Sequence, residues 1–363
     1  MPQNKMMANV FYEPERMEYR EVDVPRISET EVLIKVKACG ICGSDVSYYY
    51  GKSPLETPDG KGPLIIGHEI SGQVVKVGAY VERQGFFKPG DRVTLNPPQP
   101  CNTCVMCRRT KVNLCEHTST VGVSTDGGFA EYVKVGYANV YRLPDGMSYE
   151  EGAMAEPLAC ACYGIQNLDV QLGDFVVVIG SGAMGIMMAQ LCKMRGAGKV
   201  LVTDVEDFPL ETAKTVGADY VYNTLKADSP FYTPDIRETV KTLTGGLLAD
   251  RVIVPTSAKA AYRDAFRVSG KASTIVFFGL PGEQDVIEVP ALETLTSNKT
   301  VRFSWLAPFT WEPAMKALAS GKLQLKPLIT HTFSLEDTVK GIQYMHSGAR
   351  DKIKGMILLE KEG

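Results

Sequence analysis

The segment DFVVVIGSGAMG, residues 174–185, decides the fold, because it joins a continuous apolar run to a glycine-rich turn. The apolar run is typical of a strand buried on both faces of a sheet, and AMGIMMAQLCKMRG (183–196) has the composition of a helix. Next come a predicted strand (199–204), a predicted helix (209–217) and another predicted strand (218–223). This alternation predicts a parallel sheet covered by helices on both faces.

The glycine-rich turn also predicts a dinucleotide site. Gly180 would allow a tight turn, Gly182 would let a pyrophosphate approach the backbone, and Gly185 would let the helix pack on the strand. Asp204 ends the next strand, where an acidic side chain accepts hydrogen bonds from the adenosine ribose and repels a 2′-phosphate. We therefore expect NAD rather than NADP, bound against Gly180, Gly182, Ala183, Met184, Gly185 and Asp204.

The sequence before this region has a different pattern of apolar runs and turn residues. Runs rich in β-branched residues, such as EVLIKVKA (31–38) and ISGQVVKVGAYV (70–81), alternate with turn clusters such as KPGDRV (88–93). This pattern predicts a mostly antiparallel β domain. The sequence ends in KIKGMILLEKEG (352–363), which predicts a closing strand.

Composition sets the cellular context. The 363 residues have a net charge of -3 and no long basic or acidic run, so no nucleic-acid or membrane partner is expected. Charged residues interrupt the N-terminal stretch, and no apolar run is long enough to span a bilayer. A cytoplasmic protein is expected, and in that reducing setting nine cysteines favour metal binding or thiol chemistry over disulfides.

Four of these cysteines are closely spaced. Cys101, Cys104, Cys107 and Cys115 follow the pattern C-x2-C-x2-C-x7-C, in which one loop can wrap a tetrahedral ion. Four thiolates would fill the coordination shell, so the predicted zinc is structural. The alternatives are an iron–sulfur cluster and four unrelated loop thiols.

A family resemblance becomes specific when further motifs are added. The motifs are CGICGSD (39–45), GHE (67–69), the four-cysteine loop, DGGFAEY (126–132), EPLA (156–159) and GSGAMG (180–185). In this order they resemble the zinc-dependent medium-chain dehydrogenase/reductase family, most closely its polyol and sorbitol dehydrogenase branch. The resemblance implies a GroES-like β domain from residues 1–163 and 301–363, interrupted by a Rossmann domain at 164–300.

The resemblance also implies a second, catalytic zinc. Cys42 and His68 would be ligands, and the third ligand would be Glu69, Glu156 or water. Asp45 would orient His68 from behind. A zinc with an open position would bind the substrate hydroxyl, Ser44 would take the hydroxyl proton, and hydride would pass to the nicotinamide. Cys39, in contrast, is predicted to be a small buried core residue.

Several local alternatives stay open. Cys160 or Cys162 could replace Glu156 at the metal, and at least one of the tyrosines at 48–50 is expected to line the substrate pocket. Two positions depart from the family pattern. Ser47 stands where many members carry a histidine that relays the proton to solvent, and 255–257 reads Pro-Thr-Ser where relatives usually have an acidic or Cys-Thr-Gly sequence.

The predicted function is therefore reversible oxidation of a secondary hydroxyl of a polyol, cyclitol or sugar derivative, with NAD and two zinc ions per chain. The alternatives are a threonine-type amino-alcohol dehydrogenase, a sugar-phosphate dehydrogenase and a noncatalytic zinc-stabilised dinucleotide-binding protein. Joint retention of Cys42, Ser44, His68 and Glu156 argues against the noncatalytic alternative. A homodimer or homotetramer is expected.

Overall fold

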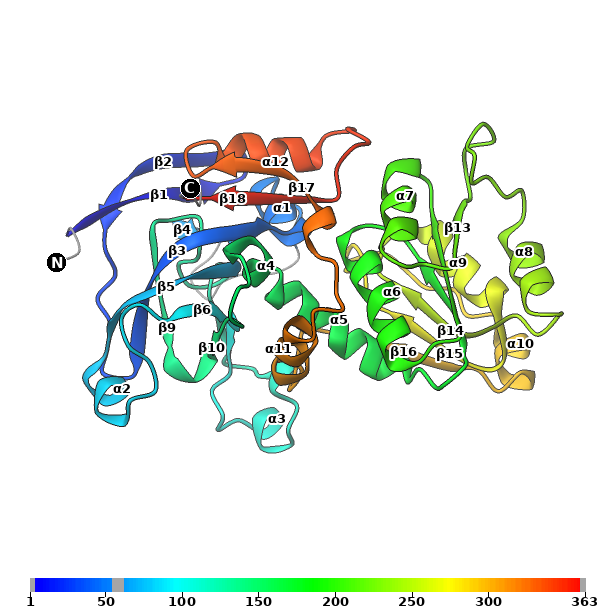
Figure 1. The fold of residues 1–363 in the computed structure, drawn as a ribbon, viewed down its shortest axis with the longest axis horizontal. Coiled ribbons are helices and arrows are strands. Elements are labelled where there is room, and N and C mark those ends of the chain that lie inside the picture. The colour runs from blue at the N-terminus through cyan, green and yellow to red at the C-terminus, as the bar shows by residue number, and fades with distance from the viewer. Residues whose placement is uncertain (1–3, 54–61, 360–363) are drawn as a thin grey trace. The chain divides into compact units, whose positions relative to one another are not determined.

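The computed structural model of the chain describes residues 4–53 and 62–359, which form two compact units (Figure 1). Unit 1 comprises Met1–Pro157, Ala314–Ala319 and Ile329–Gly363, and unit 2 comprises Leu158–Pro313 and Ser320–Leu328. The strand at 300–303 belongs to unit 2, because it pairs with the parallel sheet of that unit. Which segments fold as independent domains stays a prediction.

Unit 1 is built mainly of strands. They are β1 (Lys5–Glu13), β2 (Arg16–Asp23), β3 (Glu31–Ile41), β4 (Leu64–Ile65), β5 (Glu69–Val77), β6 (Arg92–Leu95), β7 (Pro98–Gln99), β8 (Ser119–Thr120), β9 (Tyr132–Gly136), β10 (Val140–Arg142), β17 (Ile329–Ser334) and β18 (Lys354–Leu358). Its helices are α1 (Gly43–Tyr49), α2 (Ala79–Gln84), α3 (Val105–Arg108), α4 (Tyr149–Ala153) and α12 (Thr338–His346), with 3₁₀-helices η1 (Val112–Leu114) and η2 (Tyr137–Asn139).

The central sheet of unit 1 has the order β10-β6-β5-β3-β18-β17, and β9 also pairs with β3. Its pairings are antiparallel except that of β17 with β18, which is parallel. A second sheet has the order β2-β1-β4. Apolar residues from both sheets, including Phe11, Ile34, Ile70 and Val135, form one buried cluster. The prediction of a mostly antiparallel, GroES-like β domain is confirmed.

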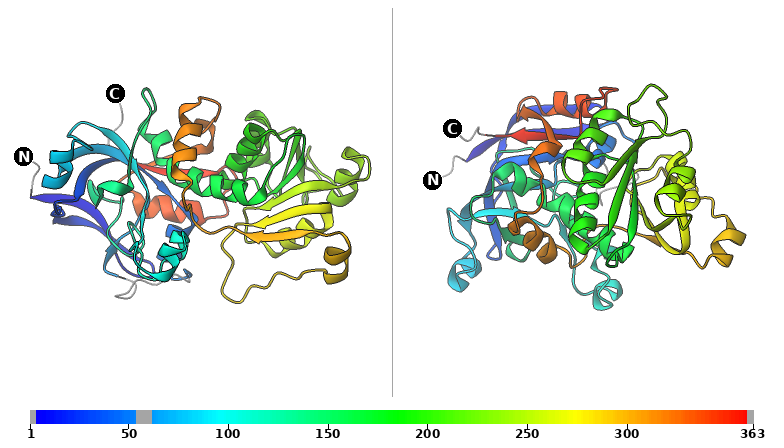
Figure 2. Two further views of the ribbon diagram at one scale, coloured as in Figure 1. Left: turned by 90° about the horizontal axis from the view of Figure 1, so that it is seen from below. Right: turned by 45° about the vertical axis from the view of Figure 1, so that its right-hand side comes forward.

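Unit 2 holds a parallel sheet in the order β13-β12-β11-β14-β15-β16 (Figure 2). Its strands are β11 (Phe175–Ile179), β12 (Lys199–Asp204), β13 (Tyr220–Asn223), β14 (Ala249–Val254), β15 (Ser269–Phe277) and β16 (Thr300–Phe303). Its helices are α6 (Ala183–Arg195), α7 (Asp207–Thr215), α8 (Ile236–Leu243), α9 (Lys259–Val268) and α10 (Ala291–Thr296), with the 3₁₀-helix η3 (Lys326–Leu328). Helices α5 (Ala155–Leu168) and α11 (Trp311–Ala319) each contain a unit boundary. The predicted Rossmann sheet is confirmed.

Strand β11 shows why the sequence pattern was informative. All of its residues are buried, and alternate ones, Phe175, Val177 and Ile179, belong to the apolar cluster that also includes residues of α8 and α9. Helix α6 ends at Gly196, whose φ of +100° is a left-handed conformation that glycine adopts without cost. From β11 the strand order runs outward to β13, and from β14 it runs outward to β16. The switch point therefore lies between the ends of β11 and β14.

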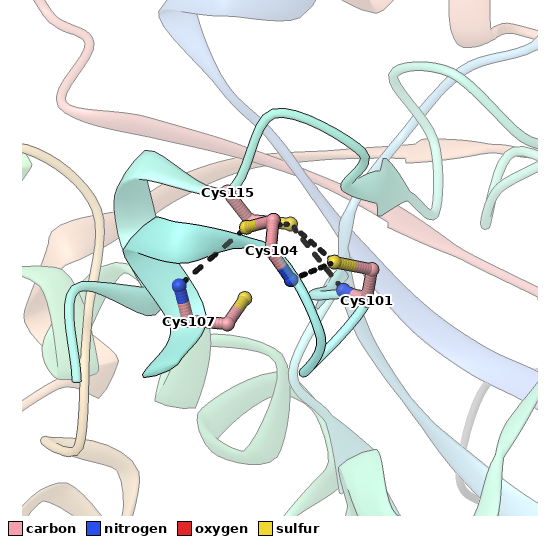
Figure 3. A group of neighbouring side chains, drawn as sticks. All are labelled: Cys101, Cys104, Cys107 and Cys115. Carbon is pink, nitrogen blue, oxygen red and sulfur yellow. Dashed lines mark hydrogen bonds between the residues drawn. The ribbon is translucent and has the colours of Figure 1, made fainter. Parts of the chain in front are cut away.

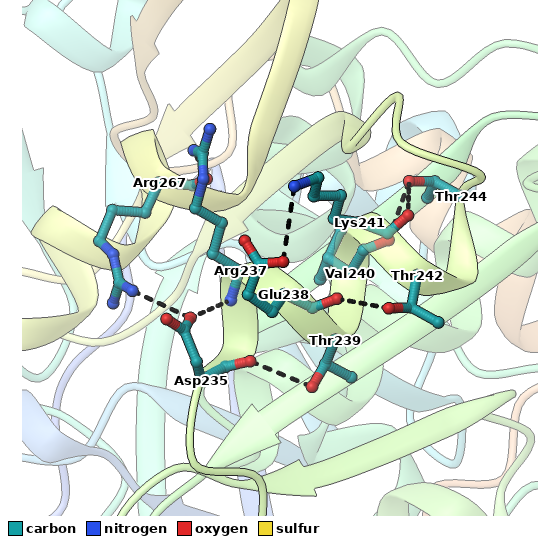
Figure 4. A network of polar contacts seen from close by, with 9 residues as sticks. All are labelled: Asp235, Arg237, Glu238, Thr239, Val240, Lys241, Thr242, Thr244 and Arg267. Atoms are coloured by element: carbon teal, nitrogen blue, oxygen red, sulfur yellow. Dashed lines mark hydrogen bonds and ion pairs between the residues drawn. The ribbon is translucent and has the colours of Figure 1, made fainter.

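A polar network connects the start of α8 with the end of α9 (Figure 4). Asp235 precedes α8, and its carboxylate accepts hydrogen bonds from the Arg237 backbone at 2.8 Å and from the Arg267 guanidinium, at the end of α9, at 2.9 Å. Because both partners of the ion pair are exposed, its contribution to stability is only about 0.2–1 kcal/mol. The network therefore positions the helices more than it stabilises the fold.

In the part of the chain that the structure describes, no helix is both long and apolar enough to cross a membrane.

Candidate active site and cofactor site

The first candidate site lies in unit 1, where β3 leads into α1. Cys42 precedes the helix, and its backbone N–H donates to the Asp45 carboxylate at 2.8 Å. Asp45 is buried, and its other oxygen lies 3.3 Å from Nδ1 of His68. This is an ion-pair contact rather than a well-aligned hydrogen bond. Asp45 thus links the segment that carries the thiol to the segment that carries the imidazole.

Strand pairing brings the second segment to the first. His68 directly precedes β5, Glu69 is its first residue, and Gly40 of β3 is directly opposite Glu69 in the register. A Cβ at Gly40 would lie 1.9 Å from a Glu69 carboxylate oxygen, so only glycine leaves room for this side chain. The strand register therefore places Glu69 beside the other two predicted zinc ligands, Cys42 and His68.

The predicted ligand atoms of Cys42, His68 and Glu69 all lie within 4.8 Å of one another. Ser44 Oγ lies 3.5 Å from Nε2 of His68, at the side of the ring away from the Asp45 contact. Glu156 is buried at the start of α5, but among the described residues its carboxylate is not part of this group. The structure therefore brings together three of the four predicted ligands and the predicted proton acceptor.

Lys354 is a partner that the sequence analysis missed. Its ammonium lies 2.5 Å from both carboxylate oxygens of Glu69, and both side chains are buried. Strand β18 carries Lys354, and its antiparallel pairing with β3 brings this lysine to Glu69 although 285 residues separate them. A lysine in an otherwise apolar closing strand was the available signal, because a buried ammonium needs a partner.

The charges of the site influence one another. Burial lowers the pKa of His68, but the negative charges of Asp45 and Cys42 outweigh burial and raise it well above its usual value. Burial likewise lowers the pKa of Lys354, and Glu69 and Cys42 outweigh that effect. The acidic groups of the site thus favour positive charge beside them, which a bound cation would also supply.

The donor set fits a zinc ion. A thiolate, an imidazole nitrogen and a carboxylate are the ligands that zinc prefers, and three protein ligands leave a position for substrate. The Asp45 contact at Nδ1 leaves Nε2 of His68 for the metal, which is the usual arrangement around a ligating histidine. Cys39 is fully buried and burial raises its pKa well above the usual range, so it is the core residue that was predicted.

The four-cysteine loop forms a second donor group (Figure 3). The Cys115 sulfur lies 3.5 Å from that of Cys101 and 3.9 Å from that of Cys104. Four sulfurs around a tetrahedral zinc, each about 2.3 Å from the ion, stand about 3.8 Å apart. The loop therefore fits a closed structural zinc site.

Backbone N–H groups prepare this loop for thiolates. The Cys104 N–H donates to the Cys101 sulfur at 3.3 Å, and the Cys107 N–H donates to the Cys104 sulfur at 3.5 Å. Hydrogen bonds from Thr103 are the main reason why the pKa of Cys101 falls to about 5, whereas burial raises that of Cys107 to about 12. Four thiolates this close together would repel one another, and a bound metal cation would offset that repulsion.

In unit 2 the glycine-rich turn lies at the switch point of the parallel sheet. Gly180 has a φ of +118°, and a Cβ at Gly185 would lie 1.8 Å from the Gly180 carbonyl oxygen, so both positions require glycine. Gly182 is exposed at the start of α6, and a Cβ there would meet nothing within 4 Å. Ala183 and Met184 follow in the first turn of α6. The helix start is therefore open to a phosphate group.

Asp204 ends β12 beside this turn. Its Oδ2 accepts hydrogen bonds from the backbone N–H of Ser181 at 2.6 Å and from the Ser181 hydroxyl at 2.8 Å. Its Oδ1 accepts from the backbone N–H groups of Val205 at 2.7 Å and Glu206 at 3.1 Å. Asp204 therefore stands where a ribose acceptor was predicted, but its carboxylate is engaged by the chain itself.

Comparison with known proteins gives full-length relatives. Residues 28–145 match the sequence model of the alcohol dehydrogenase GroES-like domain, and residues 183–320 match that of zinc-binding dehydrogenases. Sorbitol dehydrogenase of Bombyx mori is 34% identical over 95% of this chain and 97% of that protein. L-threonine 3-dehydrogenase of Bacillus velezensis is 32% identical, over 92% and 93%. Galactitol-1-phosphate dehydrogenase from Escherichia coli superposes with a TM-score of 0.84 at 27% identity, over 97% and 100%.

Proposed function

The chain belongs to the zinc-dependent medium-chain dehydrogenase/reductase family, and on this basis we propose that it oxidises a secondary hydroxyl of a polyol, cyclitol or sugar derivative reversibly with NAD. The prediction of an enzyme is confirmed, since the relatives that match nearly the whole chain are dehydrogenases. Zinc and NAD are its cofactors. The observation that carries the proposal is the gathering of the Cys42, His68 and Glu69 ligand atoms beside the Ser44 hydroxyl.

Residues of unit 1 would bind the zinc and transfer the substrate proton. Cys42, His68 and a carboxylate, Glu69 or Glu156, would hold the zinc, which when bound supplies a Lewis acid that lowers the pKa of the substrate hydroxyl. Ser44 would relay the hydroxyl proton: its Oγ, 3.5 Å from Nε2 of His68, accepts the substrate proton as it gives its own proton to water. Ser47 cannot hold the proton at neutral pH, so water completes its transfer to solvent.

Lys354 acts on Glu69. The ion pair gives the buried carboxylate a partner, and its geometry ties Glu69 to β18 instead of leaving it free to swing. We assign Lys354 a positioning role, in which it sets how closely Glu69 approaches the metal.

The pocket chemistry favours a substrate with several hydroxyl groups. Tyr48 is buried on α1, its hydroxyl has no hydrogen-bond partner among the described residues, and it lies one helical turn after Ser44. Side chains four residues apart leave the same face of a helix, so we infer that this hydroxyl faces the substrate position beside Ser44, while the Tyr48 ring packs edge-on against Phe11 with 5.0 Å between the ring centroids. A second substrate hydroxyl would satisfy it, whereas a simple alcohol would not.

We predict that kcat/KM for the best polyol, cyclitol or sugar exceeds that for ethanol by about one to two powers of ten, because an unpaired buried polar group costs about 1–3 kcal/mol. Steady-state kinetics on a panel that includes L-threonine and sugar phosphates measures this. Tyr48→Phe is the matched variant, and it should lower kcat/KM for the polyol more than that for ethanol. Higher efficiency with a simple alcohol than with every polyol, cyclitol and sugar would overturn the substrate assignment.

For the cofactor, we predict a preference for NAD over NADP that shrinks about a hundredfold in Asp204→Ala. One hydrogen bond from a ribose hydroxyl to a charged group, worth about 1.5–3 kcal/mol, and repulsion of a 2′-phosphate would be lost together. The measurement is kcat/KM with both cofactors at a fixed substrate concentration. Asp204→Asn, which keeps the shape without the charge, should give an intermediate ratio. Equal efficiency of the wild-type enzyme with both cofactors would contradict the role of Asp204.

We also propose that the enzyme is a homodimer or a homotetramer, assembled through the β16 edge of the parallel sheet. Among the described residues β16 pairs only with β15, and exposed apolar side chains lie on α10 just before it and at its end, including Leu292, Leu295 and Phe303. An unpaired edge beside exposed apolar residues favours pairing with a second chain, and a two-fold axis would use the same patch twice.

Leu295→Asp should therefore raise the dissociation constant of the dimer about a hundredfold or more, since burial of one leucine is worth about 1.5–3 kcal/mol and the patch occurs twice. Light scattering after size exclusion, over a dilution series, gives the mass. Leu247→Asp is the matched control, because Leu247 is 78% exposed and Leu295 is 77% exposed, yet Leu247 lies outside the patch. A wild-type monomer at every concentration would exclude the assembly.

The cysteines agree with a cytoplasmic location, which we propose for this enzyme. None of the nine forms a disulfide bond in the part of the chain that the structure describes.

A further inference from the structure

The carboxylate of Asp204 has no acceptor position left for a ligand. A carboxylate offers about four lone-pair positions, two on each oxygen. In this structure Oδ2 accepts from the Ser181 N–H and the Ser181 hydroxyl, and Oδ1 accepts from the N–H groups of Val205 and Glu206. A ribose hydroxyl that donates to Asp204 must therefore displace one of these four donors.

Three of the four donors are fixed by the backbone. The Gly180 N–H donates to the Thr203 carbonyl at 2.8 Å, which holds the turn that presents the Ser181 N–H. Val205 and Glu206 follow Asp204 directly, so their N–H groups are placed by the end of β12. The Ser181 hydroxyl differs, because rotation about one side-chain bond is enough to move it away.

We propose that the Ser181 hydroxyl is a built-in competitor for the adenosine ribose: it occupies the acceptor position on Asp204 that a ribose hydroxyl of NAD takes, and it must turn away when the cofactor binds. This inference rests on the proposed use of NAD. Ser181 is fully buried, so when its hydroxyl turns away it loses its hydrogen bond to the Asp204 carboxylate, and this loss costs free energy. Three backbone donors still orient the carboxylate after the exchange. Ser181 therefore weakens NAD binding without being needed to orient Asp204.

The test is the dissociation constant of NAD, measured by calorimetry or by protein fluorescence without substrate. Ser181→Ala should bind NAD about two- to tenfold more tightly than wild type, the factor that the net worth of one hydrogen bond gives. ADP-ribose, which carries the same adenosine ribose, should show the same gain. Nicotinamide mononucleotide, which lacks that ribose, should show none. Ser181→Thr keeps a hydroxyl and should bind like wild type.

Two further proteins serve as controls: Ser181→Gly, and the Ser181 substitution made in Asp204→Ala. Ser181→Gly removes the hydroxyl without adding an apolar group, and it should show the same gain if the alanine variant does not fold. In Asp204→Ala the Ser181 substitution should have no effect on NAD affinity, because the contested acceptor is gone.

The outcomes separate the two proposals. Unchanged or weaker NAD binding by folded Ser181→Ala or Ser181→Gly, with NAD binding by wild type, overturns the exchange and leaves the proposed function standing. A gain that is equally large with nicotinamide mononucleotide also overturns it. Absence of NAD binding by wild type overturns the proposed function and this inference together.

Discussion

Cys42→Ala is expected to lower kcat/KM by about three powers of ten or more while the protein stays folded. Loss of the thiolate would weaken the catalytic zinc, whose Lewis-acid contribution is several kcal/mol, and each 1.36 kcal/mol corresponds to about a factor of ten in rate. Cys42 is only half-buried at the start of α1, so its removal leaves little cavity. Steady-state kinetics and a thermal unfolding curve on the same preparation measure the two effects.

Cys39→Ala is the matched control for this experiment. Cys39 lies three residues earlier and is fully buried, but its sulfur is not in the ligand group. Its replacement should cost some stability, as truncation of a core side chain does, and keep turnover within a few-fold of wild type. If Cys39→Ala abolished turnover and Cys42→Ala did not, the ligand assignment would be reversed.

Cys104→Ala is expected to act on stability. Structural zinc contributes apparent binding energies of about 10–16 kcal/mol in zinc-finger peptides, and folding is coupled to that binding. If only about 3 kcal/mol of it depends on Cys104 in this larger unit, Tm falls by about 6–12 °C. Well below that temperature kcat should stay near the wild-type value, because the loop lies in a different ligand group from Cys42. Differential scanning calorimetry with and without a chelator checks this.

Cys192→Ala controls for loss of a buried thiol. Cys192 is fully buried in α6 and belongs to neither ligand group of the described residues, so the Tm of Cys192→Ala should fall with the chelator by as much as the Tm of wild type does. A Cys104→Ala protein with wild-type Tm and wild-type zinc content would remove the structural metal from the account.

The sequence allowed accurate prediction where the determinants are local. Strand β11, the turn at 180–185 and α6 form one continuous stretch, and the predicted strand at 199–204 coincides with β12. The four cysteines likewise sit in one loop, so their spacing alone places their sulfurs near one another. These features needed no knowledge of how distant segments pair.

Features that depend on sheet register were not predictable in the same way. Glu69 reaches its place because Gly40 stands opposite it, and Lys354 arrives on the last strand of the chain. Burial of a lysine is costly without a partner, but the sequence does not say which carboxylate provides it. The pairing of β16 with the parallel sheet also joins residues that are distant in sequence, and it includes residues 300–303 in unit 2.

The cofactor site illustrates a finer limit. The sequence pointed to Asp204 as an acceptor, yet only side-chain coordinates reveal that its acceptor positions are filled. Glu156 is similar, since the motif around it was recognised but its carboxylate is not among the gathered ligand atoms of the described residues. Residue identity predicted which groups matter, whereas their contacts required the structure.

The central claim is that the Cys42 group holds a catalytic zinc separate from the zinc of the four-cysteine loop. Elemental analysis of wild type and Cys42→Ala, purified without chelator and assayed for turnover from the same sample, tests it most directly. The account predicts two zinc ions per chain in active wild type and one per chain in inactive Cys42→Ala, in line with the two ligand groups. Equal zinc content in both proteins, with turnover lost only in the variant, would contradict it.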